Sequence, residues 1–96
     1  MPERIVKTKE FRELSQAILE LETADECARF FRDLCTLSEL KAMAERFQVA
    51  KRVFSGGTYR EIAKRTGAST TTVTRVAHWL HHGMGGYRLV LERMRR

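Results

Sequence analysis

Apolar residues recur at spacings of three and four along most of this 96-residue chain, the period of an amphipathic helix. The long segment from about 37 to 54 shows this best, with a stripe of Leu40, Met43, Phe47, Ala50 and Phe54. No segment alternates with period two, so no strand is expected. The pattern predicts an all-α fold of six helices, over about 8–21, 24–35, 37–54, 59–65, 70–82 and 87–95.

Glycines and hydroxyl residues mark the boundaries of these helices. The glycines gather at 56–57, 67, 83 and 85–86, where a chain can turn. A hydroxyl residue followed three positions later by glutamate is typical of a capped helix start. This pairing occurs at Thr23/Glu26, Thr36/Glu39 and Thr58/Glu61. The length predicts one domain over residues 1–96.

The segment at about 58–82 has the spacing of a helix-turn-helix. Gly67 can take the left-handed conformation that ends the first helix, and Ser69 can cap the second. A steep packing of the two helices requires small or apolar residues at fixed offsets, and the chain meets them with Ala63, Gly67, Val73 and Val76, besides Ile62 as an anchor. A helical hairpin that only packs and binds no DNA would meet the same offsets.

The outward face of the second helix is rich in hydroxyl groups, because Val73 and Val76 turn inward. In DNA-binding helix-turn-helix proteins the first residues of this helix meet base edges. Threonine offers bases a donor, an acceptor and a methyl group, and cations of the first helix can contact phosphates. The expected DNA contacts are Arg60, Lys64, Arg65, Ser69, Thr70, Thr71, Thr74 and His78. For any single threonine, capping and solvent exposure explain the residue as well.

The overall composition agrees with a nucleic-acid partner. The net charge is +6 and the pI about 9.9, and a basic domain suits a polyanion, although a merely solvated surface has the same charge. No apolar run approaches the ~18 residues of a membrane span, and the charged N-terminus lacks a signal-peptide core. We therefore expect a cytoplasmic protein in which Cys27 and Cys35, about two turns apart on one helix, stay reduced.

Other constellations are weak. His78 and His82 have the i,i+4 spacing of two metal ligands, but no third ligand is evident and histidines suit a helix C-terminus. No glycine-rich phosphate loop, acid–base pair or activated cysteine stands out. We expect no metal, no cofactor and no enzymatic activity.

Two stretches resemble a known family. These are TLSELKAMAERFQVAKRVFSGGTYREIAKRTGASTTTVTRV, from residue 36, and HHGMGGYRLVLERM, from residue 81. The chain resembles the Trp repressor superfamily, especially its YerC/YecD-type relatives. The resemblance implies an intertwined homodimer of six-helix subunits. Two recognition helices would then meet successive major grooves, about 34–36 Å apart, on a two-fold-related DNA site.

The resemblance also bears on a small-molecule effector. In tryptophan-responsive members two arginines hold the corepressor, and Arg46 and Arg75 stand at the matching places, while Thr36 matches a pocket threonine. Two positions depart from those members. Val76 replaces a glycine, and Trp79 replaces a serine that engages the ligand's amino group.

Arg75 and Trp79 also lie four apart on one helix face, where an arginine can stack on an indole. Our hypothesis is that the indole plugs the pocket, so that DNA binding needs no L-tryptophan. The alternatives are a different small ligand and a purely structural Trp79.

The sequence therefore predicts a dimeric, sequence-specific DNA-binding transcriptional regulator that acts as a repressor. Two alternatives remain beside it. One is a sequence-tolerant DNA-binding protein, and the other is a protein–protein interaction module that uses the helix-turn-helix.

Overall fold

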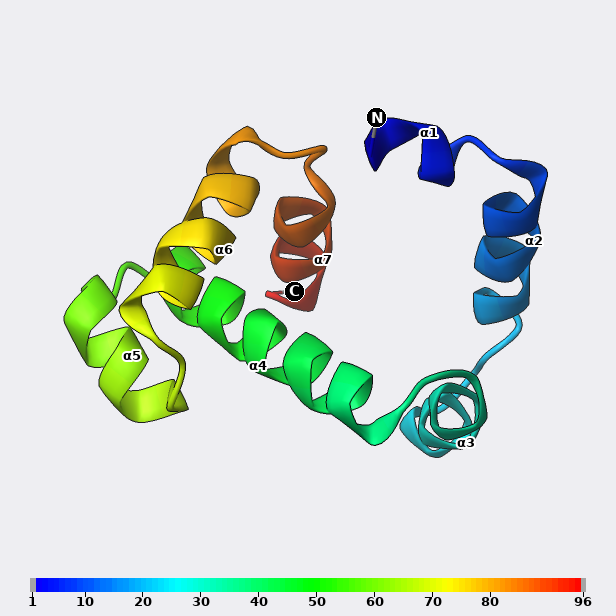
Figure 1. The fold of residues 1–96 in the computed structure, drawn as a ribbon, viewed down its shortest axis with the longest axis horizontal. Coiled ribbons are helices and arrows are strands. Elements are labelled where there is room, and N and C mark those ends of the chain that lie inside the picture. The colour runs from blue at the N-terminus through cyan, green and yellow to red at the C-terminus, as the bar shows by residue number, and fades with distance from the viewer. Residues whose placement is uncertain (1, 96) are drawn as a thin grey trace. The chain divides into compact units, whose positions relative to one another are not determined.

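The structure is a computed structural model that describes residues 2–95, and the side chains of residues 4–95. Within this range all regular structure is helical, so the all-α prediction is confirmed (Figure 1). The helices are α1 (Pro2–Val6), α2 (Lys9–Ile18), α3 (Ala24–Leu34), α4 (Leu37–Phe54), α5 (Tyr59–Thr66), α6 (Thr70–His82) and α7 (Gly86–Met94). The chain divides into two compact units, Met1–Leu37 and Ser38–Arg96. None of the described helices is long and apolar enough to cross a membrane.

Most helix boundaries follow the prediction, and both ends of α4 and α6 match it. Two differences occur in the first unit. The short helix α1 was not expected, because five residues are too few to show a helical period. The next helix ends at Ile18 rather than near 21, since the N–H of Leu21 bonds to the Ile18 carbonyl at 3.1 Å in a turn.

In the first unit the helix starts are well capped but the apolar faces are not fully covered. The Thr23 side chain accepts a hydrogen bond from the N–H of Glu26 at 3.1 Å, as its capping box predicts. Neither α2 nor α3 contains a buried residue. Their apolar side chains are half-buried or exposed, and Leu34 has 49% of its surface exposed. Within their own unit these amphipathic helices therefore leave apolar surface uncovered.

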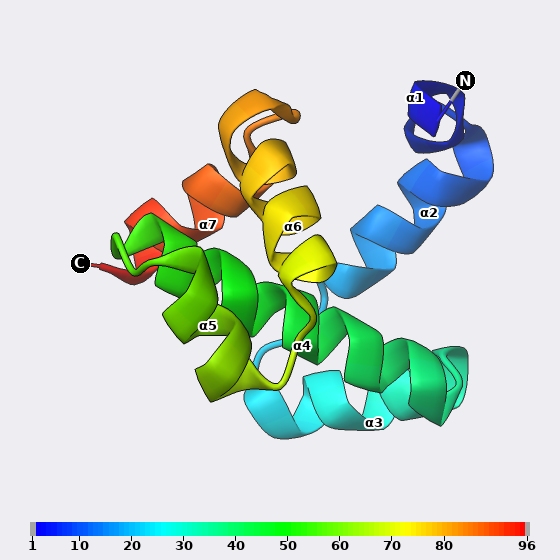
Figure 2. The same cartoon turned by 60° about the vertical axis from the view of Figure 1, so that its left-hand side comes forward.

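The second unit holds the hydrophobic core. The buried residues come from the end of α4, from α5, from the turn after it, and from α6 and α7: Val49, Ala50, Val53, Ile62, Ala68, Val73, Val76, Ala77, Leu80 and Leu91. Figure 2 shows α5 and α6 meeting at a steep angle beside α4. The guanidinium groups of Arg88 and Arg95 lie 5.8 and 4.6 Å from the ring centroid of Phe54, which ties α7 to the end of α4.

The stripe predicted for α4 was partly wrong. Ala50 is buried and Phe47 and Phe54 pack on the core, but Leu40 is only half-buried and Met43 is 38% exposed. The buried face is instead centred on the C-terminal half of the helix, because the core residues of α5, α6 and α7 pack only there. The spacing of apolar residues along one helix cannot show at which point the neighbouring helices cease to pack against it.

Candidate nucleic-acid interface

The turn between α5 and α6 is built as the sequence predicted. Gly67 is left-handed, with φ 79°, and its N–H donates to the Ala63 carbonyl at 3.0 Å. The Thr66 hydroxyl donates to the Ile62 carbonyl at 2.7 Å and accepts from the N–H of Ala68 at 3.2 Å. Ala68 itself is buried. These bonds fix the direction in which α6 leaves α5.

The second helix, α6, packs against the hydrophobic core through an apolar face. Val73, Val76, Ala77 and Leu80 are each at most 3% exposed. Ser69 caps the helix, since its hydroxyl accepts from the N–H of Thr72 at 3.1 Å. The predicted helix-turn-helix at about 58–82 is therefore present in the structure, with its apolar anchors buried.

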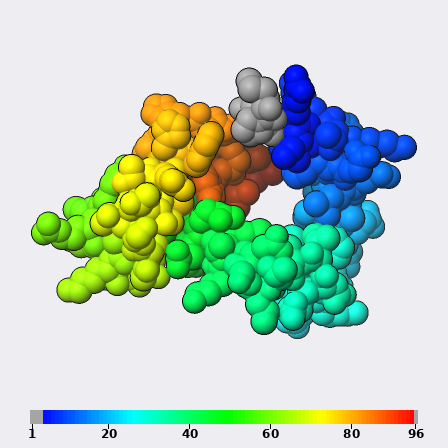
Figure 3. Space-filling model, viewed as in Figure 1, coloured from blue at the N-terminus to red at the C-terminus, as the bar shows by residue number. Residues whose placement is uncertain are grey.

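The residues predicted to contact DNA all lie on the surface. Those on α6 and its cap are Ser69, Thr70, Thr71, Thr74 and His78, and those on α5 are Arg60, Lys64 and Arg65. Figure 3 shows the yellow atoms of the first turns of α6 uncovered on one face of their unit. A face that enters a DNA groove must be exposed in this way, while the role of each side chain remains a prediction.

The hydroxyl groups of this face are not equivalent. The Thr74 hydroxyl donates to the Thr70 carbonyl at 2.9 Å, so it closes a bond inside the helix. The Ser69 hydroxyl donates to the Thr72 hydroxyl at 3.1 Å. Among the described side chains, none shares a hydrogen bond with the hydroxyls of Thr70 and Thr71. These two side chains are therefore the ones on this face whose hydroxyls no described residue engages.

A separate cavity of about 380 Å³ gathers most of the predicted effector residues. It lies between α4, α6 and the start of α7, and its lining residues are Ala42, Glu45, Arg46, Thr72, Arg75, Val76, Trp79 and Tyr87. Four of the five residues proposed for an effector pocket thus line one cavity. The fifth, Thr36, belongs to the first unit, and its place in a pocket stays a prediction.

The indole of Trp79 lines this cavity without closing it. The residue is 56% exposed, and its ring meets His78 edge-on, with 5.3 Å between centroids. The predicted stacking of Arg75 on the indole is absent, because the cation–π contacts among the described side chains are those of Phe54.

Sequence reasoning missed Glu45 and Tyr87, which line the same cavity. In the sequence Glu45 directly precedes Arg46 and looks like an ordinary solvated carboxylate. Tyr87 reaches the cavity only because the chain reverses between α6 and α7. No local sequence pattern predicts that this reversal brings Tyr87 to the cavity. An acidic group beside two arginines adds a partner for a ligand's amino group to the predicted pocket.

Other side chains with ligand chemistry form no larger site. The rings of His78 and His82 lie 5.3 Å apart between centroids, and the described side chains of residues 4–95 contain no group of three histidines, cysteines or acids that could hold a metal. Both cysteines are half-buried free thiols.

Comparison with known proteins identifies the family. The family model of the Trp repressor protein matches residues 9–95. The chain belongs to the Trp repressor family. It is 41% identical over 90 residues to YerC, an uncharacterised protein of Bacillus subtilis, covering 94% of this chain and 86% of that protein.

Two crystal structures share this fold. One is a TrpR-like protein from Eubacterium eligens, with 44% identity and a TM-score of 0.89, which covers 95% of this chain and 94% of that one. The other, described as a putative Trp repressor from Staphylococcus aureus, has 41% identity and a TM-score of 0.91 over 99% of this chain and 95% of that one. The Trp repressor family is one of regulatory DNA-binding proteins, not of enzymes.

Proposed function

We propose that this protein is a sequence-specific DNA-binding transcriptional regulator that acts in the cytoplasm as a dimeric repressor. One observation carries the proposal: the first turns of α6 expose a row of hydroxyl side chains above a buried apolar back. Short side chains let the helix backbone approach the floor of a major groove. An apolar back of this kind holds the helix rigidly while its outer face meets DNA.

Within this face the groups divide into two roles. Thr70 and Thr71 hydrogen-bond to base edges, while Thr74, whose hydroxyl is bonded to the Thr70 carbonyl, offers its methyl group to thymine. The cations Arg60, Lys64 and Arg65 contact phosphates and fix the register without reading sequence. Ser69 starts the helix at its positive end, where a phosphate is favoured.

A second copy of the chain covers the apolar surface that one copy leaves exposed. This surface includes the faces of α2 and α3, which contain no buried residue. It also includes an apolar groove of about 570 Å³ in the second unit, whose lining includes Phe47, Trp79, Tyr87 and Val90. Two recognition helices related by a two-fold axis then meet half-sites about 34–36 Å apart.

L-tryptophan is not needed for DNA binding in this proposal. Val76 is buried in the core and Trp79 lines the cavity beside Arg46 and Arg75, so the protein's own indole occupies part of the space open to a ligand. The cavity still measures about 380 Å³, which favours a different small ligand as the alternative.

Selection of bound sites from random DNA, with and without L-tryptophan, tests the proposal. We expect two related half-sites about 10–10.5 base pairs apart, selected equally in both conditions. A specific-to-non-specific affinity ratio well below ~10³ would instead indicate a sequence-tolerant DNA-binding protein. A lack of DNA binding at physiological salt, together with salt-insensitive binding to another protein, would indicate an interaction module. Micromolar binding of L-tryptophan in calorimetry, coupled to tighter DNA binding, would contradict DNA binding that needs no L-tryptophan.

A further inference from the structure

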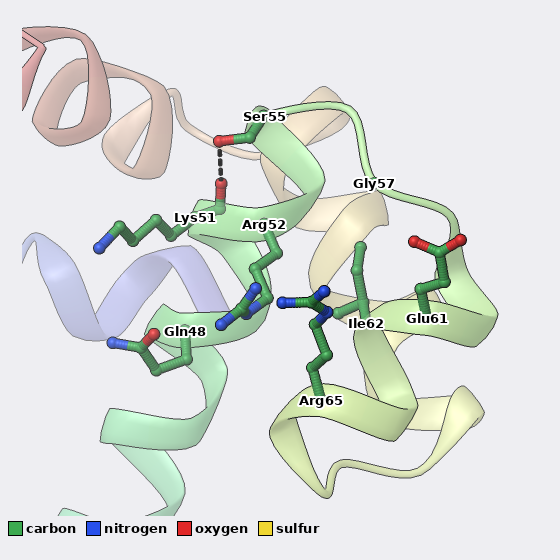
Figure 4. Close-up of a pocket in the computed structure, with 8 residues that line it drawn as sticks. All are labelled: Gln48, Lys51, Arg52, Ser55, Gly57, Glu61, Ile62 and Arg65. Carbon is green, nitrogen blue, oxygen red and sulfur yellow. Dashed lines mark hydrogen bonds between the residues drawn. The ribbon is translucent and has the colours of Figure 1, made fainter.

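A third cavity lies between the end of α4 and α5, and most of the residues that line it are polar or charged (Figure 4). It measures about 440 Å³ and shares no lining residue with the cavity of Arg46 and Arg75. We call it the basic cleft, and its lining residues are Gln48, Lys51, Arg52, Ser55, Gly57, Glu61, Ile62 and Arg65. Only Arg65 among them belongs to the predicted DNA contacts.

The charges in the basic cleft do not balance. Three cationic side chains, Lys51, Arg52 and Arg65, line it against the single carboxylate of Glu61, a formal excess of two positive charges. In Figure 4 the guanidinium groups of Arg52 and Arg65 point toward one another from α4 and α5, while the Glu61 carboxylate points away from both. Two like charges that face each other repel, and an anion held between them removes this repulsion.

One donor in the cleft lacks an acceptor. The Nε atom of Arg52 is buried, and no described residue accepts a hydrogen bond from it. A buried donor without a partner has lost its bond to water without gaining another, which is unfavourable, and more so when the group is charged. An anion that reaches into the cleft supplies the acceptor. Arg52 thus brings a positive charge to the cleft and holds beside it, at Nε, a buried N–H that no described residue engages.

The donor set suits a phosphate group better than a carboxylate. Guanidinium groups bind phosphate through two parallel N–H bonds, and a phosphate has enough oxygens to accept from Arg52 and Arg65 together, with the Lys51 ammonium as a further positive charge of the cleft. Gln48 also lines the cleft, but in Figure 4 its amide nitrogen points away from the two guanidinium groups. A planar carboxylate, with two oxygens, leaves some of these donors unbonded.

We propose that the basic cleft is a phosphate-binding site. Two sources can supply the group: a backbone phosphate of DNA or a phosphate monoester in solution. With a DNA phosphate, the inference rests on the proposed function and extends the interface from α5 to the end of α4. Arg65 connects the two, because it lies in the last turn of α5, directly before the turn into α6. With a soluble phosphate, the site stands independently of DNA.

The first experiment tests phosphate alone. The full chain is titrated with inorganic phosphate at constant ionic strength, with chloride as the balancing anion, while NMR follows the side-chain Nε–Hε signals of Arg52 and Arg65. We expect both signals to shift and saturate, and the Arg65 shift to disappear in Arg52→Gln. Lys51→Gln, which removes an exposed cation, should weaken the response if Arg52→Gln fails to fold. Lys41→Gln, an exposed lysine of α4 outside the cleft, should leave it unchanged.

The second experiment identifies the source. The affinity for a random-sequence duplex is measured against salt concentration by fluorescence anisotropy. If the cleft holds one DNA phosphate, Arg52→Gln lowers the salt slope by about 1, and Lys41→Gln does not. An unchanged slope together with saturable phosphate shifts assigns the site to a soluble phosphate.

The two possible failures are distinguishable. If the wild-type chain does not bind DNA but its arginine signals still respond to phosphate, the proposed function fails and the phosphate site stands. If DNA binds normally, the slope is unchanged in Arg52→Gln, and phosphate shifts the signals no more than chloride does, the phosphate site is overturned and the proposed function stands.

Discussion

The hydroxyl of Ser69 accepts a hydrogen bond from the N–H of Thr72 and donates one to the Thr72 hydroxyl, both at 3.1 Å. This pair closes the first turn of α6, and the hydroxyl groups of the two residues are hydrogen-bonded to each other. The row of hydroxyl residues therefore has two parts. Ser69, Thr72 and Thr74 bond within the helix, while Thr70 and Thr71 face outward with hydroxyls that no described residue engages.

Ser69→Ala is expected to destabilise the protein by about 1 kcal/mol, because it removes the side-chain cap of α6. Ser69→Asn should retain most of this stability, since asparagine caps equally well. Urea unfolding followed by circular dichroism measures both. Ser55→Ala is the control, because the Ser55 hydroxyl donates to the Lys51 carbonyl at 3.0 Å at the C-terminal end of α4 and is not an N-cap. Equal losses in Ser69→Ala and Ser55→Ala would contradict the capping role.

Gly67→Ala is expected to cost about 1–2 kcal/mol, because an L residue is strained in the left-handed conformation. A methyl group at Gly67 would meet nothing within 4 Å, so the penalty comes from the backbone and not from a clash. Gly86→Ala is a matched control. A methyl group there also has open space, but the backbone is not left-handed. Thermal unfolding should therefore show a lower midpoint for Gly67→Ala and an unchanged or higher one for Gly86→Ala.

The elements that sequence reasoning placed correctly are those with local causes. The starts of α3 and α5 follow from Thr23 and Thr58, whose side chains accept from the N–H groups of Glu26 and Glu61. The turn at Gly67 follows from one residue that tolerates a positive φ. Each of these signals lies within a few residues of the feature it causes. A single sequence is enough to detect them.

What the sequence did not reveal depends on distant contacts. The buried face of α4 is set by where α5, α6 and α7 end, which no period within α4 records. The basic cleft was missed for the same reason. Lys51 and Arg52 look like ordinary solvated cations at the end of a helix until α5 brings Arg65 opposite them.

Arg60→Gln is expected to weaken binding to all DNA sequences about equally and to lower the salt slope by about 1. Arg60 is an exposed cation of the first turn of α5, and a phosphate contact carries no sequence information. Fluorescence anisotropy with the selected site and with a scrambled site, each over a range of salt concentrations, measures this. Lys41→Gln serves as the control on α4 and should change neither affinity. A loss confined to the selected site would instead make Arg60 a base-reading residue.

Thr71 should behave differently from Arg60. Thr71→Val keeps the branched shape but removes the hydroxyl, so it should cost about 1–3 kcal/mol at one base position of the selected site. Binding to the scrambled site should be unchanged. Thr71→Ser keeps the hydroxyl and removes the methyl group, which separates hydrogen bonding from contact with a thymine methyl. Competition with single-base variants of the site locates the position. Uniform losses at every position would contradict base reading by Thr71.

Leu34→Glu is expected to disrupt the proposed dimer. Leu34 is 49% exposed in one copy, so a glutamate there is tolerable to the single chain, but it becomes costly if a second copy covers α3. Light scattering after gel filtration should give the wild type twice the 11.1 kDa mass of one chain, and give Leu34→Glu a lower mass. Arg29→Glu introduces the same side chain at an exposed polar position of α3 and should remain dimeric. If Leu34→Glu lowers the concentration-dependent unfolding midpoint instead of releasing a folded monomer, the dimer is obligate. A Leu34→Glu protein with the mass and stability of Arg29→Glu would remove α3 from the interface.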